Sequence, residues 1–342
     1  MLAEDSMTIR RHLATMINET PGLQVVGEAR DGREALLMVP ELKPDIISMD
    51  VRMPGIDGLE ATRRIMEAYP TPVVIVSGLV ETEVDLSFQA LEAGALAVVE
   101  KPPSRTDPAF DDKYRHLIKT LVAMSKVSVV RRGNTKRLQT DVTRETRQVS
   151  QPRKSPEIIA IGASAGGPSA LGKLIGDFSS NLPVPVVIVQ HMPNEFMSGL
   201  ARWLEKMSSL PVTVIENDMV LLPGMVHLAP GKAHVRVVRS RNTLRARLIS
   251  EQGTYKYCPS VDVLFESVAE TCGSAAIGLI LTGMGDDGSA GLLRMREAGA
   301  RTFAQNQASS IVFGMPGAAI ERGAVEQVLP LASLSTVISN LV

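Results

Sequence analysis

Short apolar runs recur along this chain of 342 residues, and each ends in a polar or charged residue followed by a turn. The runs end at Asp50, Ser77 and Lys101 in the front half, and at His191 and shortly before Asp287 in the back half. Helix-like patterns separate the runs, and strands that alternate with helices predict parallel sheets. The carboxyl ends of parallel strands share one edge, where ligands bind. We therefore predict an α/β protein whose chemistry gathers at sheet edges.

A poorly apolar middle segment divides the chain. Lys126–Lys154 carries nine basic and two acidic residues and little apolar periodicity, which is typical of a solvated linker. A basic run can instead bind phosphates, but this one lacks the interleaved aromatic residues of a nucleic-acid surface. We predict domains over residues 1–120 and 156–342, a basic flexible linker over 121–155, and no nucleic-acid partner.

The overall composition excludes several classes of protein. The net charge is −1 and the hydrophobic fraction is 44%, both ordinary for a globular chain. No uninterrupted apolar stretch reaches the roughly 20 residues that a membrane helix needs, and the acids Glu4 and Asp5 do not suit a signal peptide. The two cysteines, Cys258 and Cys272, form no metal-spaced cluster. We expect a cytoplasmic protein without direct membrane insertion.

The front half gathers carboxylates, a hydroxyl and a lysine at one predicted edge. Asp50 ends a strand and precedes the turn-rich segment Met53–Gly58, while Glu4 and Asp5 follow Met1–Ala3. Clustered carboxylates bind Mg²⁺, and a metal and a lysine together offset the charge of a phosphoryl group. Asp50 is therefore the candidate nucleophile for an acyl phosphate. Ser77 and Lys101 would support the phosphoryl group.

These positions resemble the response-regulator receiver domain, a flavodoxin-like fold, over about residues 1–120. The matching residues are Glu4–Ser6, Asp50, Met53–Gly58, Ser77–Gly78 and Lys101–Pro102. The resemblance implies that a histidine kinase phosphorylates Asp50. It also implies that Asp5, Asp50 and the carbonyl of Arg52 hold Mg²⁺, with Glu4 in its outer sphere. Because only three residues precede the acidic pair, we hypothesise that the true start lies upstream.

The back half contains a candidate nucleophile. Glu157–Ile161 is strand-like and leads into Gly162–Gly166, a G-x-S-x-G sequence that can expose Ser164 on a sharp turn before a helix. A dinucleotide-binding loop is the alternative, but Ser164 stands where that fingerprint needs its second glycine. By the motif alone, a plain glycine-rich turn is about as good an interpretation.

A serine nucleophile needs a base and an acid that orients it. Among the histidines of the back half, only His191 ends a predicted strand, whereas His227 and His234 do not. Asp286 and Asp287 follow another strand, and their chemistry alone leaves the choice between them open. The same glycine-rich turn makes the Met284 N–H a candidate oxyanion donor.

Over about residues 156–342 the chain resembles the catalytic domain of chemotaxis protein-glutamate methylesterases, here a doubly wound, mostly parallel α/β domain. The matching runs are Ile161–Pro168, Gln190–Pro193, Leu228–Gly231, Pro259–Phe265, Leu281–Gly288 and Phe313–Pro316. The resemblance implies a triad of Ser164, His191 and Asp287 with Met284 N–H in the oxyanion hole. Ala165 replaces a frequent threonine, so only its backbone N–H is assigned there. Tyr255–Cys258 replaces basic residues, which leaves the substrate contacts open.

The two resemblances together imply a regulated hydrolase. Its substrates would be glutamate methyl esters on the cytoplasmic helices of chemoreceptors, with methanol as product. The same acyl-enzyme can form from an amide, so deamidation of receptor glutamines is a second expected activity. The unphosphorylated receiver would cover the catalytic edge, and phosphorylation would move it. We expect no cofactor in the catalytic domain.

Overall fold

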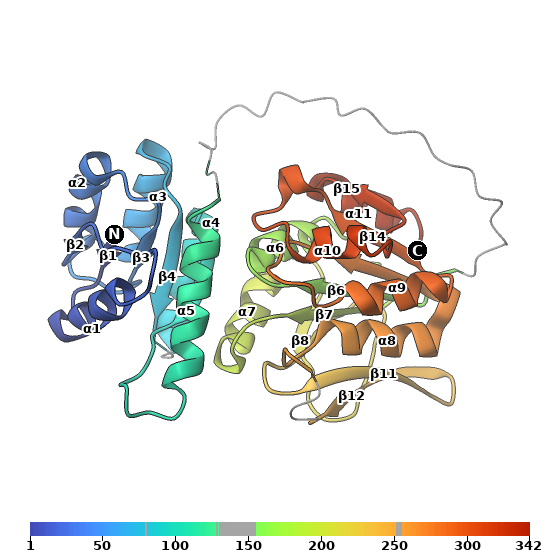
Figure 1. Ribbon diagram of the computed structural model, residues 1–342. Coiled ribbons are helices and arrows are strands. Elements are labelled where there is room, and N and C mark those ends of the chain that lie inside the picture. Colours follow the sequence, from blue (N-terminus) through green and yellow to red (C-terminus); the bar gives the residue numbers. More distant parts are fainter. Residues whose placement is uncertain (79–80, 128, 130–154, 251–254) are drawn as a thin grey trace.

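The computed structural model describes residues 1–78, 81–127, 129, 155–250 and 255–342, which form two α/β domains (Figure 1). The fold class predicted from the sequence is confirmed in both. The predicted domain boundary at residue 120 falls inside a helix that continues to Met124. Most of the predicted linker over 121–155 lies outside the described residues.

The N-terminal domain is a five-stranded parallel sheet in the order β2-β1-β3-β4-β5, the order of a flavodoxin-like fold. Its strands are β1 (Leu2–Ala3), β2 (Glu28–Ala29), β3 (Ile47–Met49), β4 (Val73–Ser77) and β5 (Ala97–Glu100). Its helices are α1 (Met7–Asn18), α2 (Gly32–Leu42), α3 (Gly58–Ala68), α4 (Glu81–Ala93) and α5 (Phe110–Met124).

Strand β1 is only two residues long, although it lies inside the sheet between β2 and β3. The amino group of Met1 donates a hydrogen bond to the carbonyl of Ile46 over 2.8 Å. Burial lowers the pKa of that amino group to about 6, although the nearby Asp45 opposes the shift. The short strand therefore holds Glu4 and Asp5 at the sheet edge. Whether the native chain begins upstream stays a hypothesis.

The C-terminal domain is built on a seven-stranded, wholly parallel sheet in the order β15-β14-β13-β6-β7-β10-β8. A smaller antiparallel sheet, β11-β12-β9, lies below it in Figure 1. The strands of the large sheet are β6 (Ile158–Ala163), β7 (Val186–Gln190), β8 (Val212–Val214), β10 (Val226–Leu228), β13 (Ala276–Ile280), β14 (Arg301–Gln305) and β15 (Gln327–Leu329). Those of the small sheet are β9 (Met219–Val220), β11 (His234–Ser240) and β12 (Thr243–Ile249).

Helices cover both faces of the large sheet, so its central strands are buried apolar runs. The α-helices are α6 (Gly167–Gly176), α7 (Met197–Met207), α8 (Val261–Cys272), α9 (Ser289–Glu297), α10 (Met315–Glu321) and α11 (Leu331–Ser339). The short 3₁₀ helices are η1 (Asn194–Phe196), η2 (Gly273–Ala275) and η3 (Gln307–Ser309). In the described part of the chain, none of the helices combines the length and the apolar character that crossing a bilayer requires.

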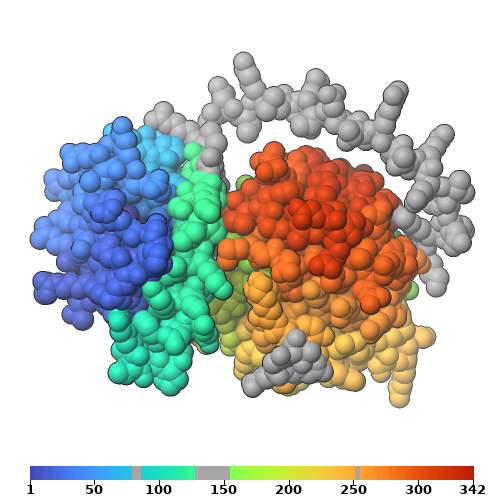
Figure 2. Space-filling view, in the orientation of Figure 1, coloured from blue at the N-terminus to red at the C-terminus, as the bar shows by residue number. Residues whose placement is uncertain are grey.

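The two domains pack against each other through α4 and α5 of the first domain (Figures 1 and 2). Helix α4 contacts α6 and α7, and the rings of Phe88 and Trp203 stack across the interface with centroids 5.9 Å apart. The indole N–H of Trp203 donates to Oε1 of Glu92 over 2.6 Å. Both aromatic side chains are buried, so this contact is part of a continuous core rather than a surface touch.

Candidate functional site

The predicted phosphorylation site forms at the carboxyl edge of the first sheet. Asp50 follows β3, Glu4 follows β1 and Lys101 follows β5. The Lys101 ammonium lies 2.8 Å from Oδ2 of Asp50 and 2.9 Å from Oε2 of Glu4. The structure therefore brings together two buried carboxylates and one partly exposed lysine, as the alternation of strands and helices predicted.

Lys101 only partly offsets the cost of burying the negative charges of Asp50 and Glu4 at this edge. Burial raises the pKa of Asp50, and its hydrogen bond to Lys101 offsets only part of that rise. Burial and the charge of Asp50 likewise raise the pKa of Glu4, against the opposing effect of Lys101. Burial opposes the charge of Lys101, but Asp50 and Glu4 outweigh it and raise the pKa of the lysine.

The arrangement fits a hard divalent cation. Ligand oxygens of Glu4, Asp5 and Asp50 lie within 4.8 Å of one another, and Asp5 is exposed to solvent. Such oxygen donors, with room for water, suit Mg²⁺. The N–H of Arg52 donates to Oδ1 of Asp50 over 3.4 Å, which places its peptide at the same edge. Ser77 ends β4, and its buried hydroxyl donates to the Gly78 carbonyl over 3.3 Å.

The loop after Asp50 depends on a close backbone approach. A Cβ atom on Gly58 would lie 1.9 Å from the carbonyl oxygen of Asp50, so only glycine fits there. Asp57 caps α3 by accepting a hydrogen bond from the Glu60 N–H over 2.8 Å. The turn-rich segment predicted from the sequence therefore closes directly onto the backbone of Asp50.

The candidate nucleophile sits on a tight turn in the second domain. Ser164 directly follows β6, and Gly166, with φ of 76°, leads into α6. The N–H of Ser164 donates to the Thr282 carbonyl over 3.1 Å. A Cβ atom on Gly283 would lie 2.9 Å from Cβ of Ser164. The loop after β13 therefore approaches Ser164 closely because residue 283 has no side chain.

His191 lies beside Ser164 because their strands are paired. Ala163 pairs with Gln190, and the N–H of His191 donates to the Ala163 carbonyl over 3.0 Å. The side-chain amide of Gln190 donates to the carbonyls of both Ser164 and His191, over 2.9 and 3.0 Å. Gln190 thus ties the two catalytic candidates together. No role was predicted for Gln190 from the sequence.

Asp287 contacts the imidazole, whereas Asp286 is exposed and faces Lys256 at 3.7 Å. Oδ2 of Asp287 lies 2.7 Å from Nε2 of His191. This contact leaves Nδ1 as the ring nitrogen available to accept a proton from Ser164. Among the described residues the Ser164 hydroxyl has no hydrogen-bond partner, so the serine–histidine link is not formed in this conformation.

The start of α8 holds the Asp287 carboxylate. Oδ1 accepts hydrogen bonds from the Ser260 hydroxyl at 2.8 Å and the Asp262 N–H at 3.1 Å. Oδ2 also accepts from the Val261 N–H at 2.7 Å. An anion at a helix N-terminus is favoured by the unpaired N–H groups and the helix dipole. The run Pro259–Phe265 was a recognisable motif, but its role in orienting the acid could not be read from it.

These bonds determine the ionisation of Asp287. Burial by itself would raise the pKa of Asp287, but His191, the Val261 N–H and Ser260 outweigh burial and lower it. The neighbouring Asp262 responds in the opposite direction. Burial, opposed by its hydrogen bond from Gly291 and aided by the charge of Asp287, raises the pKa of Asp262 to about 6. Asp287 is therefore the carboxylate that stays charged beside the imidazole.

Of the two predicted oxyanion donors, Ala165 directly follows Ser164 in the chain, and Met284 directly follows Gly283, which approaches Ser164 closely. In the described part of the chain, neither the Ala165 N–H nor the Met284 N–H donates to a protein acceptor. Thr282 braces both loops, since its hydroxyl donates to the Ala165 carbonyl over 2.9 Å and accepts from the Val312 N–H over 2.8 Å. Two N–H groups near a serine hydroxyl are what an oxyanion hole requires.

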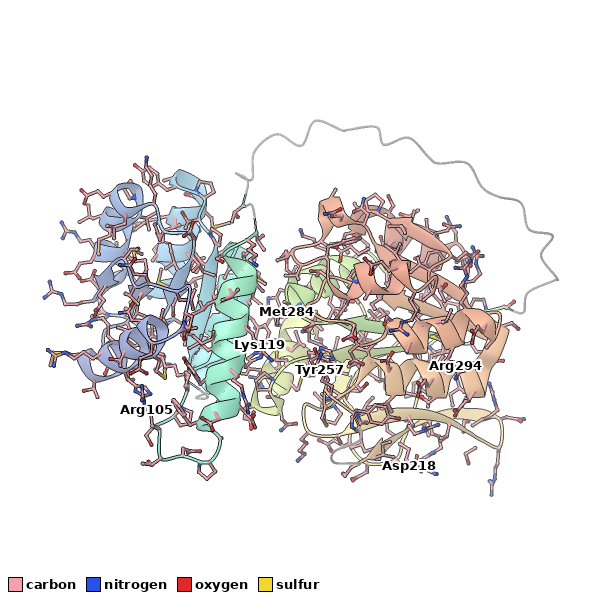
Figure 3. All side chains as sticks on the ribbon, in the orientation of Figure 1. Arg105, Lys119, Asp218, Tyr257, Met284 and Arg294 are labelled. Carbon is pink, nitrogen blue, oxygen red and sulfur yellow. The ribbon has the colours of Figure 1, made fainter. Side chains whose placement is uncertain are left out.

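Helix α5 of the first domain lies against this edge. Ala165, Ile311 and Val312 pack against the hydrophobic cluster that includes Leu117 and Met124 of α5. Figure 3 shows that α5, which carries Lys119, is an element of the first domain that stands next to the second domain. Partial burial, Lys119 and the charge of His191 lower the pKa of His116 on the same helix, although much of His116 remains exposed. The receiver therefore stands over the rim that carries Ser164.

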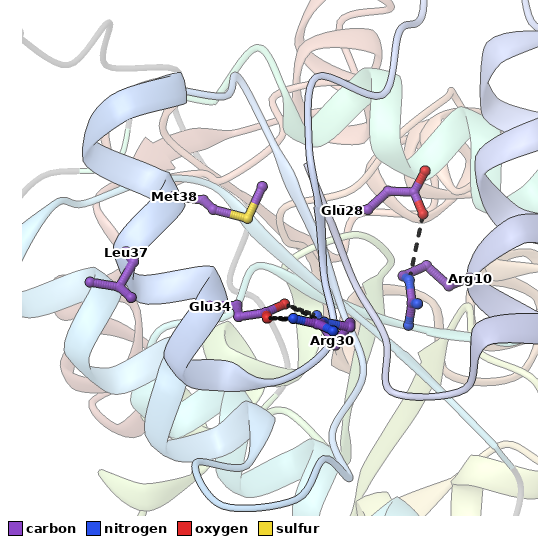
Figure 4. Close-up of a pocket in the computed structure, with 6 residues that line it drawn as sticks. All are labelled: Arg10, Glu28, Arg30, Glu34, Leu37 and Met38. Atoms are coloured by element: carbon purple, nitrogen blue, oxygen red, sulfur yellow. Dashed lines mark hydrogen bonds and ion pairs between the residues drawn. The ribbon is translucent and has the colours of Figure 1, made fainter.

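A pocket of about 480 Å³ lies elsewhere, on the outer flank of the first domain (Figure 4). It is lined by Arg10, Glu28, Arg30, Glu34, Leu37 and Met38. Ion pairs between Arg10 and Glu28, at 3.5 Å, and between Arg30 and Glu34 cross it. None of the predicted site residues lines this pocket. Because its charges already pair with one another, it offers no convergent chemistry.

Comparisons with known proteins match both halves of the chain. The model of the CheB methylesterase family matches residues 159–338, and that of the response regulator receiver domain matches residues 1–107. The protein-glutamate methylesterase/protein-glutamine glutaminase 4 of Myxococcus xanthus is 43% identical over 98% of this chain and 94% of its own length. A relative of the same description from Syntrophus aciditrophicus is 41% identical over 100% and 97%.

A solved structure supports the second domain. The CheB methylesterase catalytic domain of Thermotoga maritima is 35% identical, with a TM-score of 0.54, and covers 55% of this chain and all of its own. Sequence relatives over the full length and a structural relative of the catalytic half thus agree with the two resemblances that the motifs suggested. The chain belongs to the protein-glutamate methylesterase/protein-glutamine glutaminase family, in which a receiver domain precedes a CheB methylesterase domain.

Proposed function

We propose that this protein hydrolyses glutamate methyl esters on the cytoplasmic helices of chemoreceptors, with Ser164, His191 and Asp287 as its catalytic residues. The observation that carries the proposal is the 2.7 Å contact between Asp287 and His191 on the strand neighbouring Ser164. Family membership supports the substrate class, since the relatives are named for this reaction. A cytoplasmic location follows from such a substrate.

The reaction begins when Ser164 Oγ attacks the ester carbonyl and passes its proton to His191. The carbonyl oxygen gains negative charge, which the N–H groups of Ala165 and Met284 stabilise. His191 returns the proton to the departing methoxide, and methanol leaves an acyl-enzyme. Water, deprotonated by His191, then releases the glutamate and restores Ser164. Asp287 fixes the ring and stabilises the imidazolium in both steps. A glutamine amide would release ammonia by the same route, so deamidation is a second proposed activity.

Regulation starts at Asp50, which a histidine kinase would phosphorylate. Asp5, Asp50 and the carbonyl of Arg52 would hold Mg²⁺, with Glu4 in its outer sphere. The cation would offset charge on the incoming phosphoryl group. Lys101 and Ser77 would contact the phosphoryl oxygens. Phosphorylation adds a charge of about −1.5 to −2 at an edge whose carboxylates are already poorly compensated. The resulting rearrangement would loosen α4 and α5 from the catalytic rim.

The test is methanol release from methylated receptor, with and without acetyl phosphate and Mg²⁺. We expect the phosphodonor to accelerate the wild-type protein and not an Asp50→Ala variant. Ser164→Ala should lose activity by a factor on the order of 10⁶, as in other serine triads. Phosphorylation of Asp50 in that variant is the folding control. Retention of more than a few per cent of the wild-type rate would exclude Ser164 as the nucleophile.

A further inference from the structure

The side chain of Tyr257 lies directly on the imidazole that the mechanism uses. Its ring is nearly parallel to the ring of His191, with an angle of 12° and a centroid separation of 4.8 Å. Tyr257 is half-buried, and only 12% of the His191 side chain remains exposed. One face of the imidazole is thus covered by an aromatic ring, while its Nε2 edge is held by Asp287.

The other end of Tyr257 reaches the loop of the predicted oxyanion donor. A Cβ atom on Gly285 would lie 2.7 Å from the Tyr257 hydroxyl oxygen, so the hydroxyl packs against bare backbone there. Gly285 has a φ of 91°, and directly follows Met284. A side chain at residue 285 would push Tyr257 away. Tyr257 therefore spans the two catalytic groups, with its ring on the base and its hydroxyl against the oxyanion loop.

The position of this ring matters most when His191 becomes charged. The imidazole takes a proton from Ser164, so a positive charge develops beneath the face of Tyr257 during the reaction. The negative face of an aromatic ring attracts a cation. An interaction that is stronger in the transition state than in the resting enzyme raises kcat rather than substrate affinity. The stack also limits rotation of the imidazole.

We propose that Tyr257 is a positioning residue for His191, which fixes the plane of the imidazole and stabilises its protonated form. The inference rests on the proposed role of His191 as the base. Tyr257 lies in the segment Tyr255–Cys258, which stands where the resembling family has basic residues. The proposal gives this difference from the family a catalytic consequence. The aromatic ring performs this role. The hydroxyl group packs against Gly285 and interacts with Lys256, whose ammonium lies 5.2 Å from the centroid of the same ring.

The experiment compares Tyr257→Phe, which keeps the ring, with Tyr257→Leu, which removes it. Two rates are measured on the full-length protein with acetyl phosphate and Mg²⁺. One is methanol release, separated into kcat and KM. The other is sulfonylation of Ser164 by phenylmethylsulfonyl fluoride, in which an O–S bond forms, the S–F bond breaks and His191 takes the serine proton. The second rate needs the base but not the receptor.

We expect Tyr257→Phe to stay within about twofold of wild type in both rates. Tyr257→Leu should lower kcat and the sulfonylation rate by about tenfold, the size of a cation–aromatic contact at a desolvated site, with KM unchanged. Tyr69→Leu, which removes a 49% exposed tyrosine from the first domain, is the matched control and should change neither rate. Circular dichroism normalises each rate to the folded fraction.

Several results would overturn the proposal. Sulfonylation of Tyr257→Leu at the wild-type rate would exclude a positioning role, and an equal loss in Tyr257→Phe would assign the effect to the hydroxyl instead of the ring. Failure of the proposed function has a different signature. If the wild-type protein is sulfonylated at Ser164 but releases no methanol, the substrate is wrong, and the Tyr257 variants are still decided by their sulfonylation rates.

Discussion

Each domain has a buried aspartate at the carboxyl edge of its parallel sheet, but the two carboxylates differ in the hydrogen-bond donors around them. Asp50 is 4% exposed and Asp287 is 5% exposed, so their burial is the same. Asp287 accepts hydrogen bonds from Ser260, from two N–H groups at the start of α8 and from His191. Asp50 has Lys101 and one long contact of 3.4 Å to the Arg52 N–H.

The pKa shifts of the two aspartates follow the number of hydrogen-bond donors to each carboxylate. The bonds to Asp287 lower its pKa, whereas burial raises the pKa of Asp50 despite Lys101. Asp287 is therefore fully satisfied, which suits a group that orients another and does not react. Asp50 retains unsatisfied charge, which suits a nucleophile that awaits a cation and a phosphoryl group. Burial alone does not distinguish the two functions, and the hydrogen-bond donors do.

The strongest test of this contrast is Asp287→Asn set against Asp286→Asn. The first change removes the charge that stabilises the imidazolium, and related triads lose about 10⁴ in kcat from such a change. Asp286 is exposed and pairs only loosely with Lys256, so its variant should keep at least half of the wild-type kcat. Methanol release measures both. Equal losses in the two variants would contradict the assignment of the acid.

Ser260→Ala sharpens the contrast by removing one donor from Asp287 while leaving the carboxylate in place. A hydrogen bond to a charged group contributes about 1.5–3 kcal/mol, part of which the neighbouring N–H groups and water will replace. We expect kcat to fall about tenfold, with little change in KM. Ser260 also caps α8, so the thermal stability of the variant is measured alongside. An unchanged kcat would show that the backbone donors suffice.

Trp203→Phe tests whether the contact between the two domains restrains the catalytic edge of the second domain. The change preserves the stack on Phe88 but removes the indole N–H that donates to Glu92. Loss of about 1 kcal/mol from the closed interface should raise the basal esterase rate about fivefold without phosphodonor. The rate with phosphodonor should not change, which serves as the internal control. A basal rate equal to that of wild type would mean that this contact does not hold the receiver closed.

The smallest expected effect is on stability, and it has opposite signs at the two aspartates. A lowered pKa means that ionised Asp287 stabilises the fold above its unfolded pKa of about 4, and that this stability is lost as the pH falls through the folded pKa. A raised pKa means that ionised Asp50 costs stability at pH 7, and that protonation relieves the cost as the pH falls.

We therefore expect Asp287→Asn to lower the free energy of unfolding by about 1 kcal/mol at pH 7, and Asp50→Asn to leave it unchanged or raise it by a similar amount. Both differences from wild type should shrink toward acid pH. Because the folded pKa of Asp287 lies below its unfolded value, thermal unfolding of the full-length variants, without Mg²⁺, is followed from pH 8 to well below pH 4. Destabilisation of the same size by both substitutions would remove the distinction between the two sites.

Much of the candidate site could be predicted because parallel strands impose a rule. Each strand of such a sheet delivers its last residue to one edge, so Asp50, Lys101, Ser164 and His191 could be assigned to an edge from apolar runs alone. The glycine turn around Ser164 and the flavodoxin-like order of the first sheet follow from the same alternation. Periodicity and turn residues are local properties, and local properties are readable from sequence.

The remaining features required residues distant in the chain to meet. Asp286 and Asp287 are chemically equal in the sequence, and the family resemblance implied Asp287 without a physical reason. The start of α8, more than 20 residues earlier, supplies that reason by donating hydrogen bonds to Asp287. The bridge of Gln190 and the stack of Tyr257 on His191 were likewise absent from the sequence analysis. Each depends on the relative placement of loops, which no periodic pattern encodes.

By itself, the sequence determined the type of sheet, the residues at its carboxyl edges and the family to which the chain belongs, because each is written in short contiguous runs. Tertiary structure alone decided which donors hold the Asp287 carboxylate, which nitrogen of His191 it contacts and how α5 lies against the catalytic rim. The physical reason is that pKa values and hydrogen bonds at these edges depend on donors from other elements, and those donors converge only when the chain is folded.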